Sequence, residues 1–294
     1  EDQYYAVLNT RLATGKGPDL FFIQPEYAGA NGLESLAAAG YLAPVTDLAC
    51  IQNADEAKFS LLRRGDEVYS VSVGKMAVGL LYNKTLFAEN GLKFPGCWED
   101  FLACCESLKE KGIQPLTLGA QQKNGYQLGV YQIAANLLYP KEPDYDKKLR
   151  EGEKKFTDSD GWGRVFETYM DLYEKGYMDA ESTRLTVGES TDKLRTREAA
   201  MIFTSSMQAG ALLREEGQDE FAFTTLPVNG RGESTYWSMG EIGGIGLYKG
   251  TEYPQACKAV LEEFWNYVAD PDSEGSGSLP GEAQEAYQAG RYFH

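Results

Sequence analysis

The stretch over residues 67–87, EVYSVSVGKMAVGLLYNKTLF, constrains the fold of this chain more than any other. It contains two short runs rich in Val, Leu and Tyr, at 68–73 and 77–82, which favours strands over a helix. Asn83 is a typical N-cap for a short helix that we expect to end at Gly91. An extended segment with Gly74 in its middle can carry the chain from one compact body into another.

A second segment of this kind, SMGEIGGIGLY, covers residues 238–248 and contains four glycines. We interpret the two segments as hinge strands of a two-lobed protein that closes on a ligand, with bending at Gly74, Gly240, Gly243 and Gly244. A length of 294 residues fits two domains of about 150 residues each. We expect an N-terminal lobe of residues 1–73 plus 244–270, a C-terminal lobe of residues 76–240, and a tail, 271–294, that packs on the C-terminal lobe.

The rest of the chain alternates between helical and strand-like patterns. Helices are predicted at 3–14, 98–111, 126–139 and 161–175, and strands at 20–23, 116–118, 200–204 and 221–226. Such alternation is typical of an α/β fold with parallel-rich sheets and helices on their faces.

Composition excludes several functions. Acidic residues outnumber basic ones 44 to 28, a net charge of −16, which argues against nucleic acid or an anionic membrane surface as a partner. The single histidine is His294, the last residue, so a His-dependent catalytic site or a zinc site lacks its imidazole. We therefore expect no cofactor, no metal and no catalysis.

The five cysteines have no metal-type spacing. They are Cys50, Cys97, Cys104, Cys105 and Cys257. We expect buried, inert thiols, because free cysteine usually behaves as a small hydrophobic residue. A disulfide between Cys97 and Cys104 is the alternative.

Four blocks carry a family resemblance, in the order that the family shows. They are RLATGKGPDLFFIQ, then GLLYNKTLFAENGL with CWEDFLACCESLKEKGIQPLTLGA, then REAAMIFTSSMQAGALL, then GGIGLYKGTEYPQACKAVLEEFWNYV. The chain resembles the family 1 extracellular solute-binding proteins of carbohydrate ABC transporters. The resemblance implies a two-lobed, type II periplasmic-binding-protein-like fold that binds a sugar between its lobes and delivers it to a membrane permease. It also implies an extracellular or periplasmic location, in Gram-positive bacteria with a lipid anchor on an N-terminal cysteine, and we expect a monomer.

Two departures from the family pattern concern the ends of the chain. Family members have a strand and a helix before the segment matched by residues 3–14, and further helices after the one matched by 254–268. The resemblance therefore implies truncation at both ends and an empty position in the N-terminal sheet.

Ligands of open α/β sheets lie beyond the carboxyl ends of the strands, and this rule selects five sets of residues. The candidates are Gln24, Glu26 and Tyr27; Lys75 and Met76; Gln121, Asn124, Tyr126 and Gln127; Ser205, Ser206 and Met207; and Tyr236, Trp237, Met239 and Glu241.

A sugar needs a flat aromatic ring to stack on and planar amides or carboxylates that engage its hydroxyl groups. Tyr27, Tyr126 and Trp237 are the expected platforms. The expected polar partners are Gln24, Glu26, Asn124, Gln127 and Glu241. Ser206 and Met207 start a helix whose free N–H groups can donate to an oxygen. Alternatively, Lys75 is a solvated hinge residue and Ser205-Ser206 is an ordinary helix cap.

Three functions remain open. The first is a transport binding protein, which the two hinge segments favour. The second is a glycoside hydrolase, which needs two carboxylates about 5–10 Å apart and would use Glu26 and Glu241. The third is a ligand-sensing adaptor on the same fold.

Overall fold

The chain folds into two compact units in this computed structural model, which describes residues 2–25, 27, 29–54, 59–122, 125–269 and 281–293. Unit 1 contains residues 1–76 and 240–278, and unit 2 contains 77–239 and 279–294. Strand β6 (Lys75–Asn83) begins in unit 1 and continues into unit 2, whereas β10 (Trp237–Glu241) begins in unit 2 and ends in unit 1. Both strands lie in the segments that the sequence identified as extended.

Unit 1 is organised around strand β11 (Gly244–Tyr248). Its neighbours are β1 (Leu20–Ile23), β2 (Leu42–Ala43) and β5 (Ser70–Ser72), and each of them pairs antiparallel with β11. A separate ribbon joins β3 (Arg63–Arg64) to β4 (Glu67–Val68).

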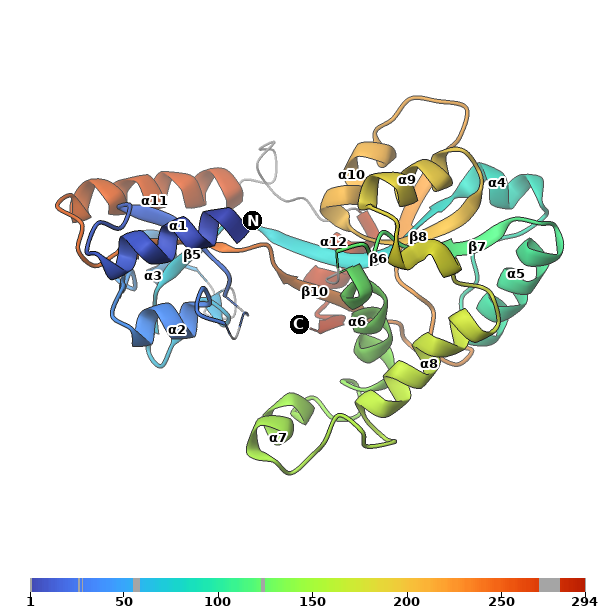
Figure 1. The fold of residues 1–294 in the computed structure, drawn as a ribbon, viewed down its shortest axis with the longest axis horizontal. Coiled ribbons are helices and arrows are strands. Elements are labelled where there is room, and N and C mark those ends of the chain that lie inside the picture. Colours follow the sequence, from blue (N-terminus) through green and yellow to red (C-terminus); the bar gives the residue numbers. More distant parts are fainter. Residues whose placement is uncertain are drawn as a thin grey trace. The chain divides into compact units, whose positions relative to one another are not determined.

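Helices cover both faces of the unit 1 sheet. Successive side chains of each strand point to opposite faces, so both faces carry apolar residues. Phe21, Ile23 and Tyr248 pack with α1 (Asp2–Ala13) and α2 (Leu33–Ala38), while Leu20 and Leu247 pack on the other face. That face is covered by α3 (Ala49–Gln52) and α11 (Pro254–Ala269). In Figure 1, α1 and α11 lie against the strands of this unit.

Unit 2 has a larger sheet with the order β12-β10-β6-β8-β7, and β9 also pairs with β6. The strands not yet given are β7 (Gln114–Thr117), β8 (Ala199–Ser205), β9 (Phe221–Thr224) and β12 (Tyr292–Phe293). Side chains again alternate between the two faces of the sheet and form two hydrophobic clusters. Leu80 and Phe203 belong to the first cluster, and Leu81 and Ile202 belong to the second.

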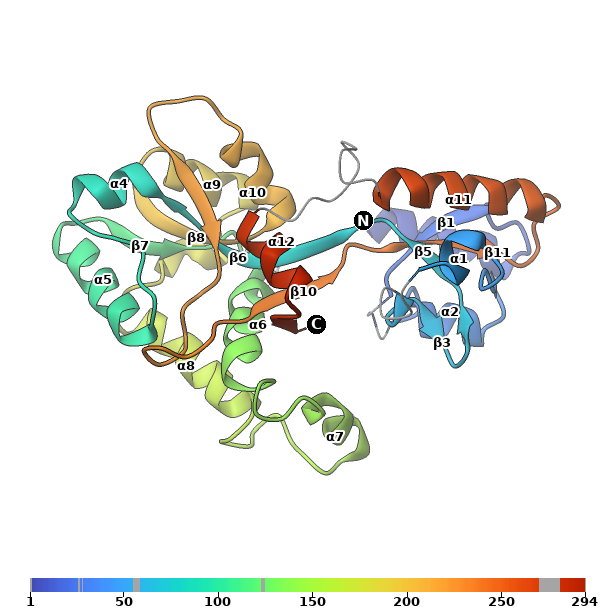
Figure 2. The same cartoon turned by 180° about the vertical axis from the view of Figure 1, so that it is seen from behind.

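Each face of the unit 2 sheet carries its own helices. The first cluster includes residues of α5 (Trp98–Glu110), α6 (Gly125–Leu137) and α8 (Trp162–Glu174), and the second includes residues of α9 (Val187–Arg195), α10 (Ser206–Leu213) and α12 (Gly281–Gln288). Figure 2 shows α12 beside β10. The remaining elements are α4 (Lys84–Glu89), α7 (Tyr145–Glu151) and the 3-10 helix η2 (Ala180–Thr183).

The C-terminal residues belong to unit 2. Ala283 and Ala286 of α12 are buried in its second cluster, and β12 runs parallel to β10. Residues 270–280, which precede α12, lie outside the described residues.

The prediction of parallel-rich sheets was wrong. Parallel pairing occurs at β7–β8 and β10–β12, whereas all three partners of β11 are antiparallel to it, and β8 and β9 are antiparallel to β6. Parallel neighbours in a sheet need a crossover connection, usually a helix. Strand β11 instead follows β10, which enters from unit 2, so no crossover helix links β11 to its neighbours.

All five cysteines are free and buried. Burial raises the pKa of Cys104 to about 11, and burial with the nearby Glu262 carboxylate raises the pKa of Cys50 to about 12. Both thiols stay protonated at pH 8, and the thiolate is the reactive form. We expect less than one thiol per native chain to react quickly with Ellman's reagent at pH 8, and five after unfolding in guanidinium. Rapid reaction of several thiols in the folded protein would contradict this burial.

Candidate functional site

The loop after β1 presents an exposed tyrosine in unit 1. Tyr27 is 51% exposed, and its ring lies over Gly29, where a Cβ would come within 2.2 Å of Cε1. The loop is closed at its base because Leu33 N–H donates to the carbonyl of Gln24 at 3.2 Å. The Tyr27 ring therefore packs close to Gly29, and the side chain remains accessible. Glu26 lies outside the described residues.

Lys75 and Glu241 meet at the edge of unit 1. Lys75 Nζ donates to Glu241 Oε1, and Ser72 Oγ donates to Glu241 Oε2. The carboxylate of Glu241 is thus already engaged on both oxygens, while Met76, the next residue along β6, is half-buried. Their role as ligand contacts remains a prediction.

Glycines beside this contact are tightly packed. A Cβ on Gly243 would come within 2.1 Å of the Phe22 ring, and one on Gly244 within 2.6 Å of Ser70 Oγ. Neighbouring side chains leave no room for a Cβ at either position, so packing alone explains why both residues are glycine.

Tyr126 and Gln127 form the first turn of α6 in unit 2. The helix start is packed closely against the loop after β7, since a Cβ on Gly125 would lie 2.4 Å from the carbonyl oxygen of Gly119. That loop is fixed in turn, because Ala120 N–H and Gln121 N–H donate to the carbonyls of Ser182 and Leu185. Gln127 is exposed and Tyr126 half-buried. Asn124 lies outside the described residues.

Ser205 and Ser206 mark the start of α10. Ser205 caps the helix by accepting from Gln208 N–H at 3.4 Å, and Ser206 Oγ accepts from Ala77 N–H at 3.1 Å. Ser206 is buried, whereas Met207 is 56% exposed. The serines therefore hold the helix to β6, and Met207 is the accessible member of this set.

Trp237 and Met239 lie in the core of unit 2. Trp237 is 4% exposed and packs against Phe223 with ring centroids 5.4 Å apart. Met239 is 2% exposed in the same cluster. In this arrangement little of the Trp237 ring is open to a ligand, whereas the neighbouring Tyr236 is half-buried. The assignment of Trp237 as a platform stays a prediction.

Sequence reasoning missed a buried amide network that holds the segment before β10. Asn136 of α6 accepts from Tyr236 N–H at 2.7 Å and donates to the Tyr236 carbonyl at 2.9 Å. Gln132, one turn earlier, accepts from Leu226 N–H and from Thr225 Oγ1. Two amides four residues apart on one helix face are the only sequence signal, and apolar patterning does not detect it.

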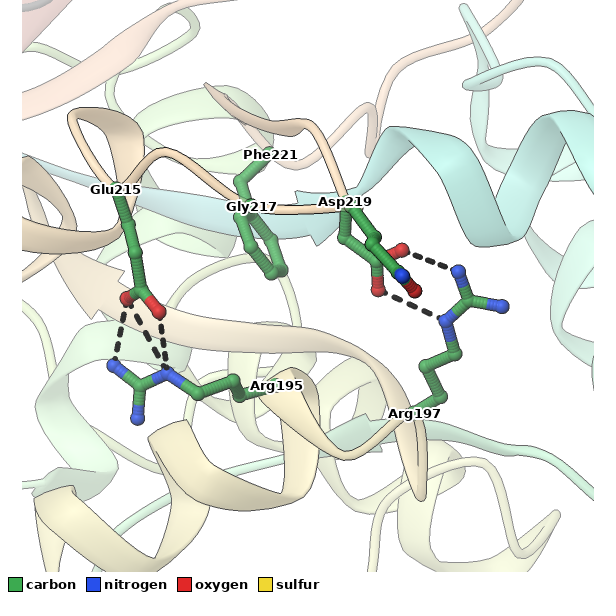
Figure 3. Close-up of a pocket in the computed structure, with 7 residues that line it drawn as sticks. Arg195, Arg197, Glu215, Gly217, Asp219 and Phe221 are labelled. Carbon is green, nitrogen blue, oxygen red and sulfur yellow. Dashed lines mark hydrogen bonds and ion pairs between the residues drawn. The ribbon is translucent and has the colours of Figure 1, made fainter.

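Unit 2 also contains a pocket of about 210 Å³ away from these residues, between the end of α9 and the loop before β9. Figure 3 shows Arg195 paired with Glu215 and Arg197 paired with Asp219. The guanidinium of Arg197 lowers the pKa of Asp219, chiefly through their hydrogen bonds. Because the charges that line the pocket neutralise one another, we assign it a structural role.

Metal chemistry and membrane insertion find no support in the described part of the chain. No group of three or more potential metal-binding side chains occurs there. None of the helices described is both long and apolar enough to cross a bilayer.

The chain belongs to the bacterial extracellular solute-binding protein family, whose profile matches residues 1–275. This is a family of binding proteins and not of enzymes. The "Multiple sugar-binding protein" of Streptococcus mutans serotype c is 31% identical over 134 residues, which cover 44% of this chain and 31% of that protein. The "Melibiose/raffinose/stachyose-binding protein MelE" of Bacillus subtilis is 24% identical over 151 residues, 50% of this chain and 34% of that protein. The matches thus span about a third of the length of these curated relatives.

Solved structures agree on the fold. A "Chitin oligosaccharide binding protein" has a TM-score of 0.76 at 22% identity, covering 97% of this chain and 75% of its own. A structure titled "SBP RafE in complex with raffinose" has a TM-score of 0.71 at 19% identity, covering 98% and 78%. The chain therefore has the two-lobed, type II periplasmic-binding-protein-like fold that was expected.

Proposed function

We propose that this chain is part of the substrate-binding component of an ABC importer, which captures a sugar or oligosaccharide between its lobes and delivers it to a membrane permease. Its membership of the solute-binding family, over residues 1–275, carries the proposal. The names of the two curated relatives indicate a carbohydrate. Attachment of the full-length protein to the outer cell surface by a lipid, and a monomeric state, belong to the same proposal.

The candidate residues supply the chemistry that a sugar requires. Tyr27 offers an accessible ring in unit 1, and Tyr126 and Gln127 offer a ring and an amide on a well-anchored helix start in unit 2. We propose these three as ligand contacts, together with Gln24 and Met207, and keep the remaining predicted residues as a second set: Glu26, Lys75, Met76, Asn124, Ser206, Trp237, Met239 and Glu241.

The hydrolase alternative has no support in the comparisons. Of the two carboxylates that this alternative needs, Glu26 lies outside the described residues, and both oxygens of Glu241 already accept hydrogen bonds from Lys75 and Ser72. No observation favours the adaptor over the transport protein.

Thermal unfolding with a panel of raffinose, stachyose, melibiose and chitin oligosaccharides tests the proposed function. A sugar at a hundredfold excess over its Kd stabilises the folded state by about 2.7 kcal/mol, which corresponds to roughly 5–10 °C in Tm. Chromatography afterwards should recover the sugar intact. Released monosaccharide, or an unchanged Tm with every sugar, would overturn the proposal.

Replacing Tyr27 by alanine should weaken binding of the sugar that gives the largest shift by about tenfold, since stacking contributes about 1–2 kcal/mol. The Tm without ligand should hardly change, because the side chain is mostly exposed. Tyr253→Ala is the matched control, since Tyr253 is 62% exposed in the same unit. Equal affinities of the two variants would remove Tyr27 from the site.

A further inference from the structure

Three side chains meet where the two crossing strands leave unit 1. Glu241, at the end of β10, receives hydrogen bonds from Lys75 at the start of β6 and from Ser72 at the end of β5. The Glu241 side chain is 1% exposed and that of Lys75 16%. The contact therefore lies inside the protein and not on a solvated surface.

The backbone joins the same two segments. Val73 N–H donates to the carbonyl of Gly243 at 3.1 Å, and Ile242 N–H donates to the carbonyl of Gly74 at 2.9 Å. Ser72 Oγ also accepts from Gly74 N–H at 3.0 Å, and Gly74 has a φ of 121°, which favours glycine. Residues 72–75 and 241–243 are thus connected by both side chains and main chain.

Burying a carboxylate is costly unless charged and hydrogen-bonding partners compensate for its lost hydration. Any slip of one strand along the other would separate Glu241 from Lys75 or from Ser72 and leave a buried charge without compensation. Contacts of this kind fix register, as buried polar groups do in other folds.

We propose that Ser72, Lys75 and Glu241 form a clamp that binds the two crossing strands to each other within unit 1. All three residues lie on the unit 1 side of the boundaries at Met76–Ala77 and Met239–Gly240. The strands consequently leave unit 1 as one fixed pair, and the chain bends beyond the clamp, on its unit 2 side, and not at Gly243 or Gly244. The part that the clamp plays in ligand capture rests on the proposed function, whereas the clamp itself does not. Within the clamp, Ser72 and Lys75 hold the Glu241 carboxylate by hydrogen bonds.

Amide hydrogen exchange of the ligand-free protein, measured by NMR, tests the clamp. In Glu241→Gln and in the milder Ser72→Ala, exchange at the amides of Val73 and Ile242 should become at least tenfold faster. Exchange at Leu247, in the middle of the unit 1 sheet, should not change. Glu220→Gln is the matched control, because Glu220 pairs with Lys84 in an exposed ion pair, and it should leave all three amides unchanged.

Unchanged exchange at Val73 and Ile242 in both variants would overturn the clamp. Equal acceleration at Leu247 would also overturn it, since that result describes general loss of unit 1 stability. Exchange with a saturating concentration of the panel sugar that gives the largest rise in Tm then tests where the chain bends: both amides should keep their protection in the wild type, and loss of protection would place the bend inside the clamp. Failure of every panel sugar to bind overturns the proposed function alone, because the ligand-free comparison already decides the clamp.

Discussion

Replacing Asn136 by leucine is expected to lower the free energy of unfolding of unit 2 by about 2 kcal/mol, because a buried polar group left without a partner costs about 1–3 kcal/mol. Asn136 is buried and makes four hydrogen bonds, to Tyr236 N–H, the Tyr236 and Gln132 carbonyls, and Asn229 Nδ2. Leucine fills the same space but pairs with none of them. The Tyr236 carbonyl keeps a bond from Thr225, Asn229 keeps one to Ser234, and the Gln132 carbonyl keeps the helical bond of α6, so the loss falls mainly on Tyr236 N–H.

Urea unfolding followed by tryptophan fluorescence measures this effect, since Trp98, Trp162 and Trp237 belong to unit 2. Gln218→Leu is the control, because Gln218 is an exposed amide in the same unit, and we expect it to change stability by less than about 0.5 kcal/mol. A loss below about 1 kcal/mol in Asn136→Leu would show that the network does not hold the segment before β10.

Gly244→Val is expected to destabilise unit 1 by about 3 kcal/mol. The Cβ of the new side chain would lie 2.6 Å from Ser70 Oγ and 2.9 Å from Ser70 Cβ. Gly244 belongs to β11, the strand that pairs with β1, β2 and β5. Overpacking of this kind usually costs about 1–3 kcal/mol, and the central position of β11 places this case at the upper end.

Hydrogen exchange resolved by peptide distinguishes packing from bending at this glycine. We expect faster exchange throughout the unit 1 sheet and little change in unit 2. The control is Gly96→Val, because a Cβ at Gly96 meets nothing within 4 Å. If Gly244→Val left unit 1 stable and changed only ligand affinity, the glycine would be a bending point, as the sequence suggested.

Local signals in the sequence predicted much of the fold. The strands around Gly74 were found because short apolar runs ended at glycine and polar residues. Asn83 does cap α4 by accepting from Leu86 N–H at 2.8 Å, and Gly91 follows that helix with a φ of 70°. These features depend on neighbours within a few residues, and a single sequence contains that information.

Features that depend on distant segments were not predicted. The burial of Trp237 results from packing by α10 and α12, and α12 lies more than forty residues further along the chain. The contact between Asn136 and Tyr236 spans 100 residues. Antiparallel pairing along β11 follows from the return of the chain from unit 2. None of these leaves a periodic pattern in its own segment.

Small-angle X-ray scattering with and without a saturating sugar from the panel tests the central claim most directly, since a binding protein of this fold closes on its ligand. The account predicts that the bound sugar reduces the radius of gyration of the chain and is recovered chemically unchanged. A sugar that binds without changing the radius of gyration, or that is cleaved on incubation, would contradict it.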